Sequence, residues 1–319
     1  MASFRMDVIG IGSAFVDYFI KTDEAFLKKL GLKPEDDFLF KEKKISKNDI
    51  FDKLKVLTKS PGGISVNTIA ALAKLNIKVG YCGVIGKDIN GDFWTKNIGN
   101  IDLSRIKRVG KTSICACLLT SQGKKRTFLS EVNPTDFDFL KNIDLNYLKS
   151  AKFIHLGPLI LNTKDGIKHT VKLIRRISKP LISFSPSILY IAEGPQKLYK
   201  IFEKTYILFL NQKEIKYLTG QKPEFGSKSL LKYGPEIVVC TLAERGALIT
   251  TFKNQFYSPR FDVDNIVDTT GAGDAFAAGF LYGLIKGKSL RWSANFANGL
   301  AAKSLTDLGL HWLKTARLS

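Results

Sequence analysis

The sequence predicts an α/β protein, a three-layer αβα sandwich in which a mostly parallel sheet lies between two layers of helices. Two observations support this fold class. Short apolar runs alternate with helical stretches along the chain, and such alternation is typical of parallel strands joined by covering helices. The chain has 319 residues and is 45% hydrophobic, which is enough to bury a sheet on both faces.

The expected strands are apolar runs that end in turn residues. In chain order they are residues 7–12, 78–86, 153–157, 180–185, 206–210, 236–241 and 247–252. Helices are expected between them, at residues 65–75, 164–178, 193–204, 212–218 and 274–286. The last of these is almost wholly apolar from Ala275 to Ile285, as a buried helix is, and is too short to span a bilayer.

Two segments interrupt this rhythm, residues 13–45 and 110–132. Both contain alternating patterns, as in SICACLLT and KRTFLSEV, which are typical of antiparallel strands with one exposed face. We expect these segments to form a small β lid, whose strands could also pair two chains into a homodimer. The length allows one large α/β domain or two smaller ones. The sequence contains no internal repeat, linker or low-complexity segment, and we expect residues 1–319 to form a single domain with this lid.

The formal net charge of +20 raises the question of nucleic-acid binding. The lysines are scattered, however, without any run of five or six like charges, and short clusters such as Lys124-Lys125-Arg126 resemble solvated loops. A lysine-rich solvated surface therefore explains the charge best, attraction for a phosphorylated substrate is an alternative, and nucleic acid is not an expected partner. The sequence does not open with the basic start and apolar run of a secretory signal. A cytoplasmic protein without membrane contact is therefore expected.

The residues of soft-metal and histidine chemistry are few. The four cysteines lie in apolar surroundings without CxxC spacing, which predicts reduced thiols and no zinc site; they are Cys82, Cys115, Cys117 and Cys240. Cys115 and Cys117 are expected to share one face of a strand. A single histidine on an apolar strand, such as His155, is usually a core residue. An aspartate is therefore favoured over a histidine as a catalytic base.

The stretch GAGD, residues 271–274, lies where the apolar helix is expected to begin. The first turn of a helix leaves backbone N–H groups unpaired, and small residues expose those of Gly271, Ala272 and Gly273 to an anion such as phosphate. A carboxylate beside that anion, here Asp274, is well placed to take a proton from a hydroxyl that attacks phosphorus. The alternative is structural, with Asp274 as the N-cap of the helix.

Other polar residues follow strands, at the edge where open α/β sheets bind ligands. Gly62 and Gly63 precede a helix that carries Asn67, and paired glycines let a backbone approach a polar ligand closely. Asp17 follows the first strand and could accept two hydrogen bonds from hydroxyl groups. Taken singly, each of these patterns is also typical of ordinary turns.

Two further patterns lie later in the chain. Asn211 and Glu214 are three residues apart on one helical face, and two oxygen ligands of this kind suit Mg²⁺ held largely through water. The turn TLAERG, residues 241–246, ends another strand with small residues and is a candidate wall for a nucleotide.

Together these motifs resemble those of the ribokinase (PfkB-type) family of carbohydrate and nucleoside kinases over nearly the whole chain. DTTGAGD, residues 268–274, is similar to the family's C-terminal motif. The glycine pair with Asn67 is similar to the substrate motif, and NQKE, residues 211–214, to the family's Asn-x-x-Glu. The resemblance implies a ribokinase-like fold and an ATP-dependent kinase that phosphorylates a sugar or nucleoside hydroxymethyl group by direct in-line transfer.

The same resemblance assigns roles to individual residues. Asp274 would be the general base, and the anion hole would consist of the N–H groups of Gly271, Ala272 and Gly273. The acceptor would be bound by Asp17, Gly62, Gly63 and Asn67. The ATP pocket would be lined by Thr241, Gly246 and Asn298. Mg²⁺ would be organised by Asn211 and Glu214, and a monovalent cation such as K⁺, which family members often hold near this motif, by Asp268 and Thr270.

The acceptor side departs from the family pattern. Ser185-Pro186 stands where many sugar kinases have Asp-Pro, and EVNPTDF replaces the usual Gly-Ala-Asn near the lid. The long segment 21–58 is similar to adenosine-kinase-like members, whereas PGG is similar to the sugar kinases. Ribose, fructose and adenosine-like acceptors therefore remain open, with a phosphosugar as an alternative. A catalytically idle member that serves as a binding or regulatory protein is the alternative of a different class.

Overall fold

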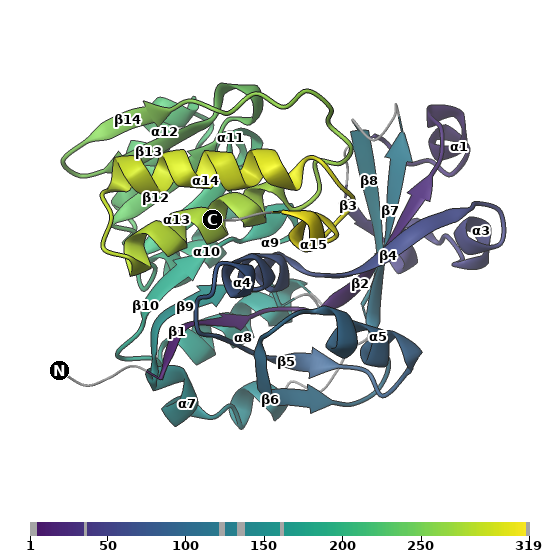
Figure 1. Ribbon diagram of the computed structural model, residues 1–319, viewed down its shortest axis with the longest axis horizontal. Helices are drawn as coiled ribbons and strands as arrows, with labels where there is room; N and C mark the ends of the chain where they lie inside the picture. Colours follow the sequence, from purple (N-terminus) through teal and green to yellow (C-terminus); the bar gives the residue numbers. More distant parts are fainter. Residues whose placement is uncertain (1–4, 35–36, 121–124, 133–137, 160–162, 317–319) are drawn as a thin grey trace.

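The computed structural model describes residues 5–34, 37–120, 125–132, 138–159 and 163–316, in which two β-sheets stand side by side (Figure 1). The large sheet has the strand order β14-β13-β12-β11-β10-β9-β1-β5-β6. Its pairs are parallel from β6 to β12 across the sheet, and β13 and β14 extend one edge in antiparallel fashion. None of the helices in these ranges is long and apolar enough to cross a membrane.

Most strands of the large sheet lie within two residues of the predicted ones. They are β1 (Met6–Ile11), β5 (Val79–Ile85), β6 (Asp102–Arg108), β9 (Ala151–Leu156), β10 (Leu181–Phe184), β11 (Ile207–Asn211), β12 (Ile237–Thr241), β13 (Ala247–Thr251) and β14 (Gln255–Ser258). The two strands that the apolar runs did not predict, β6 and β14, form the edges of the sheet. Edge strands are only partly covered, and these two accordingly have polar sequences, DLSRIKR and QFYS.

Helices cover both faces of this sheet and confirm the three-layer αβα sandwich. One core contains side chains of α4 (Ile64–Lys74), α5 (Ile89–Asn97), α13 (Ala272–Ile285), α14 (Leu290–Ser304) and α15 (Trp312–Thr315). The core on the opposite face contains side chains of α6 (Asp138–Lys141), α7 (Leu145–Lys149), α8 (Thr163–Ile174), α9 (Ser187–Ile191), α10 (Pro195–Phe202), α11 (Gln212–Thr219) and α12 (Pro223–Leu231).

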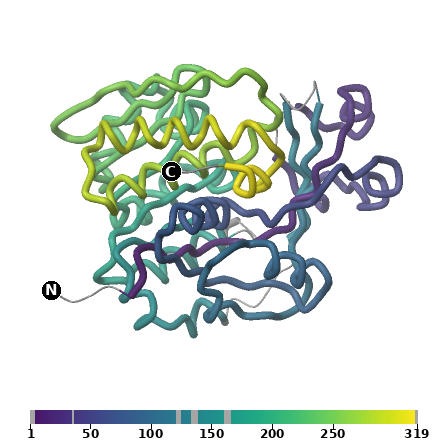
Figure 2. The backbone as a smooth tube through the Cα atoms, viewed as in Figure 1, coloured from purple at the N-terminus to yellow at the C-terminus, as the bar shows by residue number. Residues whose placement is uncertain are grey.

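The second sheet has the order β3-β8-β7-β2-β4. Its strands are β2 (Phe15–Lys21), β3 (Asp37–Leu39), β4 (Val56–Gly62), β7 (Ser113–Thr120) and β8 (Lys125–Glu131). The chain crosses into it directly after β1 and again after β6 (Figure 2). Because β1 and β6 run in the same direction, β2 and β7 pair in parallel, and the expectation of antiparallel strands was wrong for this pair. β4 lies outside the two predicted segments.

The prediction of an exposed sheet face was also wrong. The short helices α1 (Glu24–Lys29), α2 (Phe40–Lys43) and α3 (Asn48–Phe51) pack Leu27, Phe40 and Ile50 against one face of the second sheet. Every residue of β7 after Ser113 is buried. The pairing of two chains into a homodimer through the strands of this sheet stays a prediction. On the other face, the Sγ atoms of Cys115 and Cys117 are 3.9 Å apart, which confirms that they share a side.

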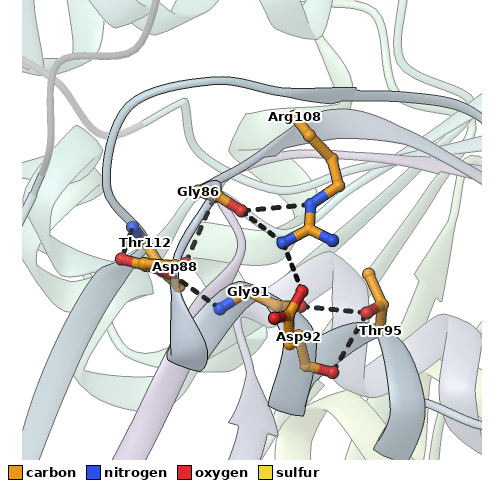
Figure 3. A network of polar contacts seen from close by, with 7 residues as sticks. All are labelled: Gly86, Asp88, Gly91, Asp92, Thr95, Arg108 and Thr112. Carbon is orange, nitrogen blue, oxygen red and sulfur yellow. Dashed lines mark hydrogen bonds and ion pairs between the residues drawn. The ribbon is translucent and has the colours of Figure 1, made fainter.

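The connection from β6 into the second sheet is held by the polar network of Figure 3. Asp88 caps the start of α5, and its carboxylate accepts hydrogen bonds from the backbone N–H and the hydroxyl of Thr112, at 2.9 and 2.5 Å. Arg108, the last residue of β6, donates to the carbonyl of Gly86 at 2.9 Å. These bonds fix the point at which the chain leaves the large sheet, and thereby the position of β7.

Candidate active site

A pocket lies between the second sheet and the helices α4, α13 and α15, and it brings together residues from distant parts of the chain. It is lined by Asp17, Asn67, Thr270, Gly271, Ala275, Gly309, Leu310 and Trp312. Four of these are predicted site residues: Asp17 comes from β2, Asn67 from α4, and Thr270 and Gly271 from the turn before α13. The segments that contain the glycine pair and the GAGD motif therefore meet in the folded chain.

Asp274 lies in the first turn of α13 and is held by α4. Asn67 Nδ2 donates to Asp274 Oδ2 at 2.8 Å. Burial raises the pKa of Asp274 to about 7, against the opposing effects of the Asn67 hydrogen bond and the positive charge of Arg126. The N-cap of this helix is Gly271, in the left-handed region at φ 75°, so the structural alternative of Asp274 as N-cap is wrong. A carboxylate with a pKa near neutrality is suited to accept a proton.

The N-terminal end of α13 is open to an approaching anion. A Cβ added to Gly273 would meet no atom within 4 Å. The N–H of Ala272 donates to the carbonyl of Thr269 at 3.4 Å, a long distance at which the group is weakly engaged. Because the α13 helix has 14 residues, its positive N-terminal end and these N–H groups together favour a phosphate.

Asp17 and Gly62 are packed against each other across β2 and β4. A Cβ on Gly62 would lie 2.0 Å from Asp17 Oδ2, so glycine is required there to make room for the carboxylate. Gly63 is the N-cap of α4 at φ 115°, a conformation that favours glycine. Asp17 is 8% exposed; burial raises its pKa to about 8, and the negative charges of Asp268 and Asp274 add to the effect.

Asn211 and Glu214 form a capping box at the start of α11. Asn211 Oδ1 accepts from the N–H of Glu214 at 2.9 Å, and Glu214 Oε2 accepts from the N–H of Asn211 at 2.8 Å. The capping box by itself therefore explains why Asn and Glu stand three residues apart here. Burial raises the pKa of Glu214 to about 7, and its charge in turn raises the pKa of Asp274. This electrostatic coupling links α11 to the start of α13.

The three residues predicted to line an ATP pocket gather at one edge of the large sheet. Thr241 ends β12 beside Asn211 of β11. Gly246 has φ 81°, and a Cβ there would lie 2.2 Å from the carbonyl oxygen of Ser258. The side chain of Asn298 donates to the same carbonyl at 3.1 Å and is buried. Asn298 therefore ties α14 to β14, and its contact with ATP stays a prediction.

Asp268, predicted near a monovalent cation, is fully buried. Its Oδ1 accepts hydrogen bonds from the N–H and the hydroxyl of Thr270, at 2.9 and 2.7 Å. Its Oδ2 accepts from the N–H of Gly309 at 3.2 Å. Three donors within the protein thus satisfy this carboxylate, which orients the turn that leads into Gly271.

Two parts of the site were missed by the sequence analysis. Arg126 belongs to β8 and is half-buried, whereas the cluster that contains it was expected to be a solvated loop. The segment from Gly309 to Trp312 lines the pocket, and its residue Leu310 donates a backbone hydrogen bond to Ser60 Oγ of β4 at 3.1 Å. Neither segment carries a motif, because both act through contacts with residues far away in the chain.

The chain is similar in sequence and in fold to known proteins. An uncharacterized sugar kinase of Archaeoglobus fulgidus is 28% identical over 242 residues, which cover 75% of this chain and 95% of the relative. The adenosine kinase of Saccharomyces cerevisiae is 25% identical over 331 residues, which cover 95% of each chain. The solved structure of adenosine kinase from Sinorhizobium meliloti superimposes with a TM-score of 0.81 at 21% identity, and 98% of each chain is covered.

Residues 26–312 match the family described as pfkB family carbohydrate kinase. The matched range contains Asn67, the NQKE motif and the whole DTTGAGD motif, whereas Asp17 lies before it. The resemblance on which the sequence analysis relied is thereby confirmed for the greater part of the chain. The protein belongs to the pfkB family and is a carbohydrate or nucleoside kinase.

Proposed function

We propose that the protein transfers the γ-phosphoryl group of ATP in line to the hydroxymethyl group of a nucleoside, with Asp274 as the general base. The observation that carries this proposal is the position of Asp274. Its carboxylate is fixed by Asn67 between the open end of α13 and the pocket that contains Asp17. A hydroxyl in the pocket and a phosphate at the helix end would both be within reach of that carboxylate.

In this mechanism each residue acts on a different part of the reaction. Asp17 and Asn67 bind the hydroxyls of the acceptor and orient its hydroxymethyl group. Asp274 takes the proton of that group as its oxygen attacks phosphorus. The backbone N–H groups of residues 271–273 stabilise the charge on the transferred phosphoryl group. Arg126, whose charge acts on Asp274, adds positive potential from the second sheet.

Mg²⁺ fits the start of α11. Asn211 and Glu214 each use one side-chain oxygen in the capping box. A carboxylate has two acceptor oxygens, so the second oxygen of Glu214 can accept a hydrogen bond from a metal-bound water. The metal, when bound, would neutralise charge on the ATP phosphates. Asp268 fits a monovalent cation less well because three protein donors already satisfy it.

We favour a nucleoside because the pocket is lined by both polar and apolar side chains. Asp17 and Asn67 suit the hydroxyls of a ribose, whereas Leu310 and Trp312 offer an apolar wall suited to a base. Asp17 is the ionisable residue among those that line the pocket, and in the ionised form that acceptor binding requires, its negative charge disfavours a phosphosugar. The adenosine kinase relative of yeast, aligned over 95% of both chains, supports the same choice. A free sugar is the second candidate, supported by the sugar kinase relative.

The proposal is tested by ADP release in a coupled assay across nucleosides, free sugars and phosphosugars. We expect the highest kcat/KM for a nucleoside, at least about tenfold above that for ribose or fructose, because a base gains contacts that a sugar lacks. A higher kcat/KM for a free sugar would replace the nucleoside by the second candidate. Absence of ADP release with every acceptor class would favour the idle, binding-only alternative.

Glu214→Gln is expected to raise the Mg²⁺ concentration needed for half-maximal rate severalfold. Glutamine keeps the cap, because a capping box accepts Gln as well as Glu, but it removes the charge that attracts the metal. The measurement is a Mg²⁺ titration of the initial rate at fixed ATP. Glu203→Gln, at an exposed position after α10, is the matched control. An unchanged titration would remove Glu214 from the metal site.

We propose that the second sheet acts as a lid. Binding of acceptor and nucleotide should then protect this sheet from hydrogen exchange and proteolysis. Slower hydrogen exchange and proteolysis are expected in residues 13–45 and 110–132, because Asp17 and Arg126 lie in these segments and closure would cover them. The measurement compares the apo protein with the ternary complex formed with a non-hydrolysable ATP analogue. Protection that is confined to the large sheet would contradict the lid assignment.

The rate should rise with pH through the neutral range. Burial raises the pKa of Asp274 to about 7 and that of Asp17 to about 8, and both carboxylates must be ionised to act. We therefore expect kcat/KM, which reports the free enzyme, to fall about tenfold per pH unit between about 8 and 7 and more steeply below. In Asp17→Asn, the pH profile of kcat/KM should retain only the decrease near pH 7 that Asp274 causes. A profile that is flat across this range would contradict these roles.

A further inference from the structure

Two cysteines of the second sheet lie beside Asp17 at the pocket. β2 and β7 pair in parallel, with Asp17 opposite Cys115 and Phe19 opposite Cys117. Side chains two residues apart on a strand share a face, so the carboxylate and both thiols lie on the same side of the sheet. The carboxylate oxygen and the two Sγ atoms all lie within 4.8 Å of one another.

The spacing of the two sulfurs is that of a tetrahedral metal site. Zn²⁺ binds thiolate sulfur at about 2.3 Å, so two sulfurs on one tetrahedral ion are roughly 3.8 Å apart. The Sγ atoms of Cys115 and Cys117 are 3.9 Å apart. With Asp17 as the third ligand, the set would leave a fourth position for a water molecule. Two thiolates select soft or borderline cations such as Zn²⁺ and Cd²⁺ over Mg²⁺.

The surroundings provide both a dry wall and a route for access. Phe15, Phe19 and Leu119 pack around the two cysteines and shield the sulfurs from bulk water. Asp17 lines the pocket, so an ion that enters the pocket meets the carboxylate first and the thiols behind it. Cys82 and Cys240 are also buried, but they belong to the core on the face of the large sheet that lies away from α4 and α13.

We propose that Asp17, Cys115 and Cys117 bind one thiophilic divalent cation, Zn²⁺ or Cd²⁺, at the wall of the pocket. The two thiols lose their protons to solvent as the ion binds, and the carboxylate completes the protein ligands. Because the ion occupies Asp17, it excludes the acceptor and inhibits the kinase. Metal binding stands on the geometry alone, whereas this inhibition also rests on the proposed role of Asp17 in acceptor binding.

Binding is tested by titrating the reduced full-length protein with Cd²⁺, in the presence of excess Mg²⁺, while the ultraviolet charge-transfer absorption of cadmium–thiolate bonds is recorded. One equivalent per chain is expected to produce the absorption. Cys115→Ala and Cys117→Ala should each weaken binding at least about tenfold. Cys82→Ala and Cys240→Ala are the matched controls and should bind as the parent protein does. Absorption that persists in both Cys115→Ala and Cys117→Ala, or that depends on the controls, would overturn the proposal.

Asp17→Asn tests the third ligand without altering either cysteine, and melting curves verify that every variant is folded. This variant should retain the thiols and bind Cd²⁺ at least about tenfold more weakly; unchanged affinity would overturn the site as proposed. In the parent enzyme, Cd²⁺ at fixed free concentration should compete with the acceptor and not with ATP. Cadmium binding without this competition would uphold the metal site and overturn inhibition through Asp17. Failure of the metal site can thus be distinguished from failure of the proposed role of Asp17 in acceptor binding.

Discussion

Asp274→Asn is expected to lower kcat at least a hundredfold at saturating acceptor, while the nucleotide still binds. A primary hydroxyl holds its proton tightly and attacks phosphorus poorly unless a base accepts the proton. General-base assistance contributes about 10²–10⁴-fold in rate, which is about 3–5 kcal/mol of the barrier. Asparagine keeps the size of the side chain and an oxygen that can accept from Asn67, but it cannot take the proton.

Three measurements on this variant separate catalysis from structure. The Kd of the nucleotide should hold or decrease, because a negative charge beside the γ-phosphate is removed. The melting temperature should hold or rise, because burial penalises the ionised carboxylate, as its raised pKa indicates. Asp144→Asn, at the N-cap of α7, is a control that should leave kcat unchanged. A near-normal kcat in Asp274→Asn would exclude Asp274 as the base.

Asp17→Asn should lower kcat/KM for the acceptor by about a hundredfold or more and leave the KM of ATP unchanged. Hydrogen bonds to a charged group contribute about 1.5–3 kcal/mol each, and the carboxylate is proposed to accept two from acceptor hydroxyls. The amide that replaces it offers a single acceptor oxygen and no charge. Initial rates with acceptor and ATP varied in turn give both quantities.

Gly62→Ala provides an independent test of the same contact. A Cβ at this position would lie 2.0 Å from Asp17 Oδ2, so the carboxylate must move and the acceptor should bind more weakly. Gly31→Ala is the control, because a Cβ there would meet no atom within 4 Å, although its φ of 66° adds local strain. Equal kcat/KM in Asp17→Asn and the parent enzyme would remove Asp17 from the acceptor site.

The sequence predicts best what is determined locally. The central strands are apolar because both faces are covered, so their runs are visible without any knowledge of their neighbours. The GAGD and NQKE motifs are likewise visible, since each combines a helix start with polar groups that are proposed to function there. The edge strands β6 and β14 carry no such signal, because their exposed faces accept polar residues.

The rest of the site depends on pairing between distant segments. The sequence could not show that Gly62 makes room for Asp17, because that requirement arises only when β2 lies beside β4. The same is true of Arg126, whose cluster of basic residues has no periodic pattern, and of the two cysteines that the β2–β7 register places beside Asp17. In each case the relevant neighbour is set by sheet order, which short-range patterns do not contain.

The segment from Gly309 to Trp312 has a consequence for the order in which the protein becomes active during synthesis. Leu310 bonds to Ser60 across 250 residues of chain, and Gly309 bonds to Asp268 of the turn before α13. Contacts of such long sequence separation form late, since the loop between them must first be closed. A nascent chain can therefore assemble much of both sheets before the proposed acceptor pocket exists. Phosphoryl transfer should begin only after residue 312 has left the ribosome, so incomplete chains would not consume ATP.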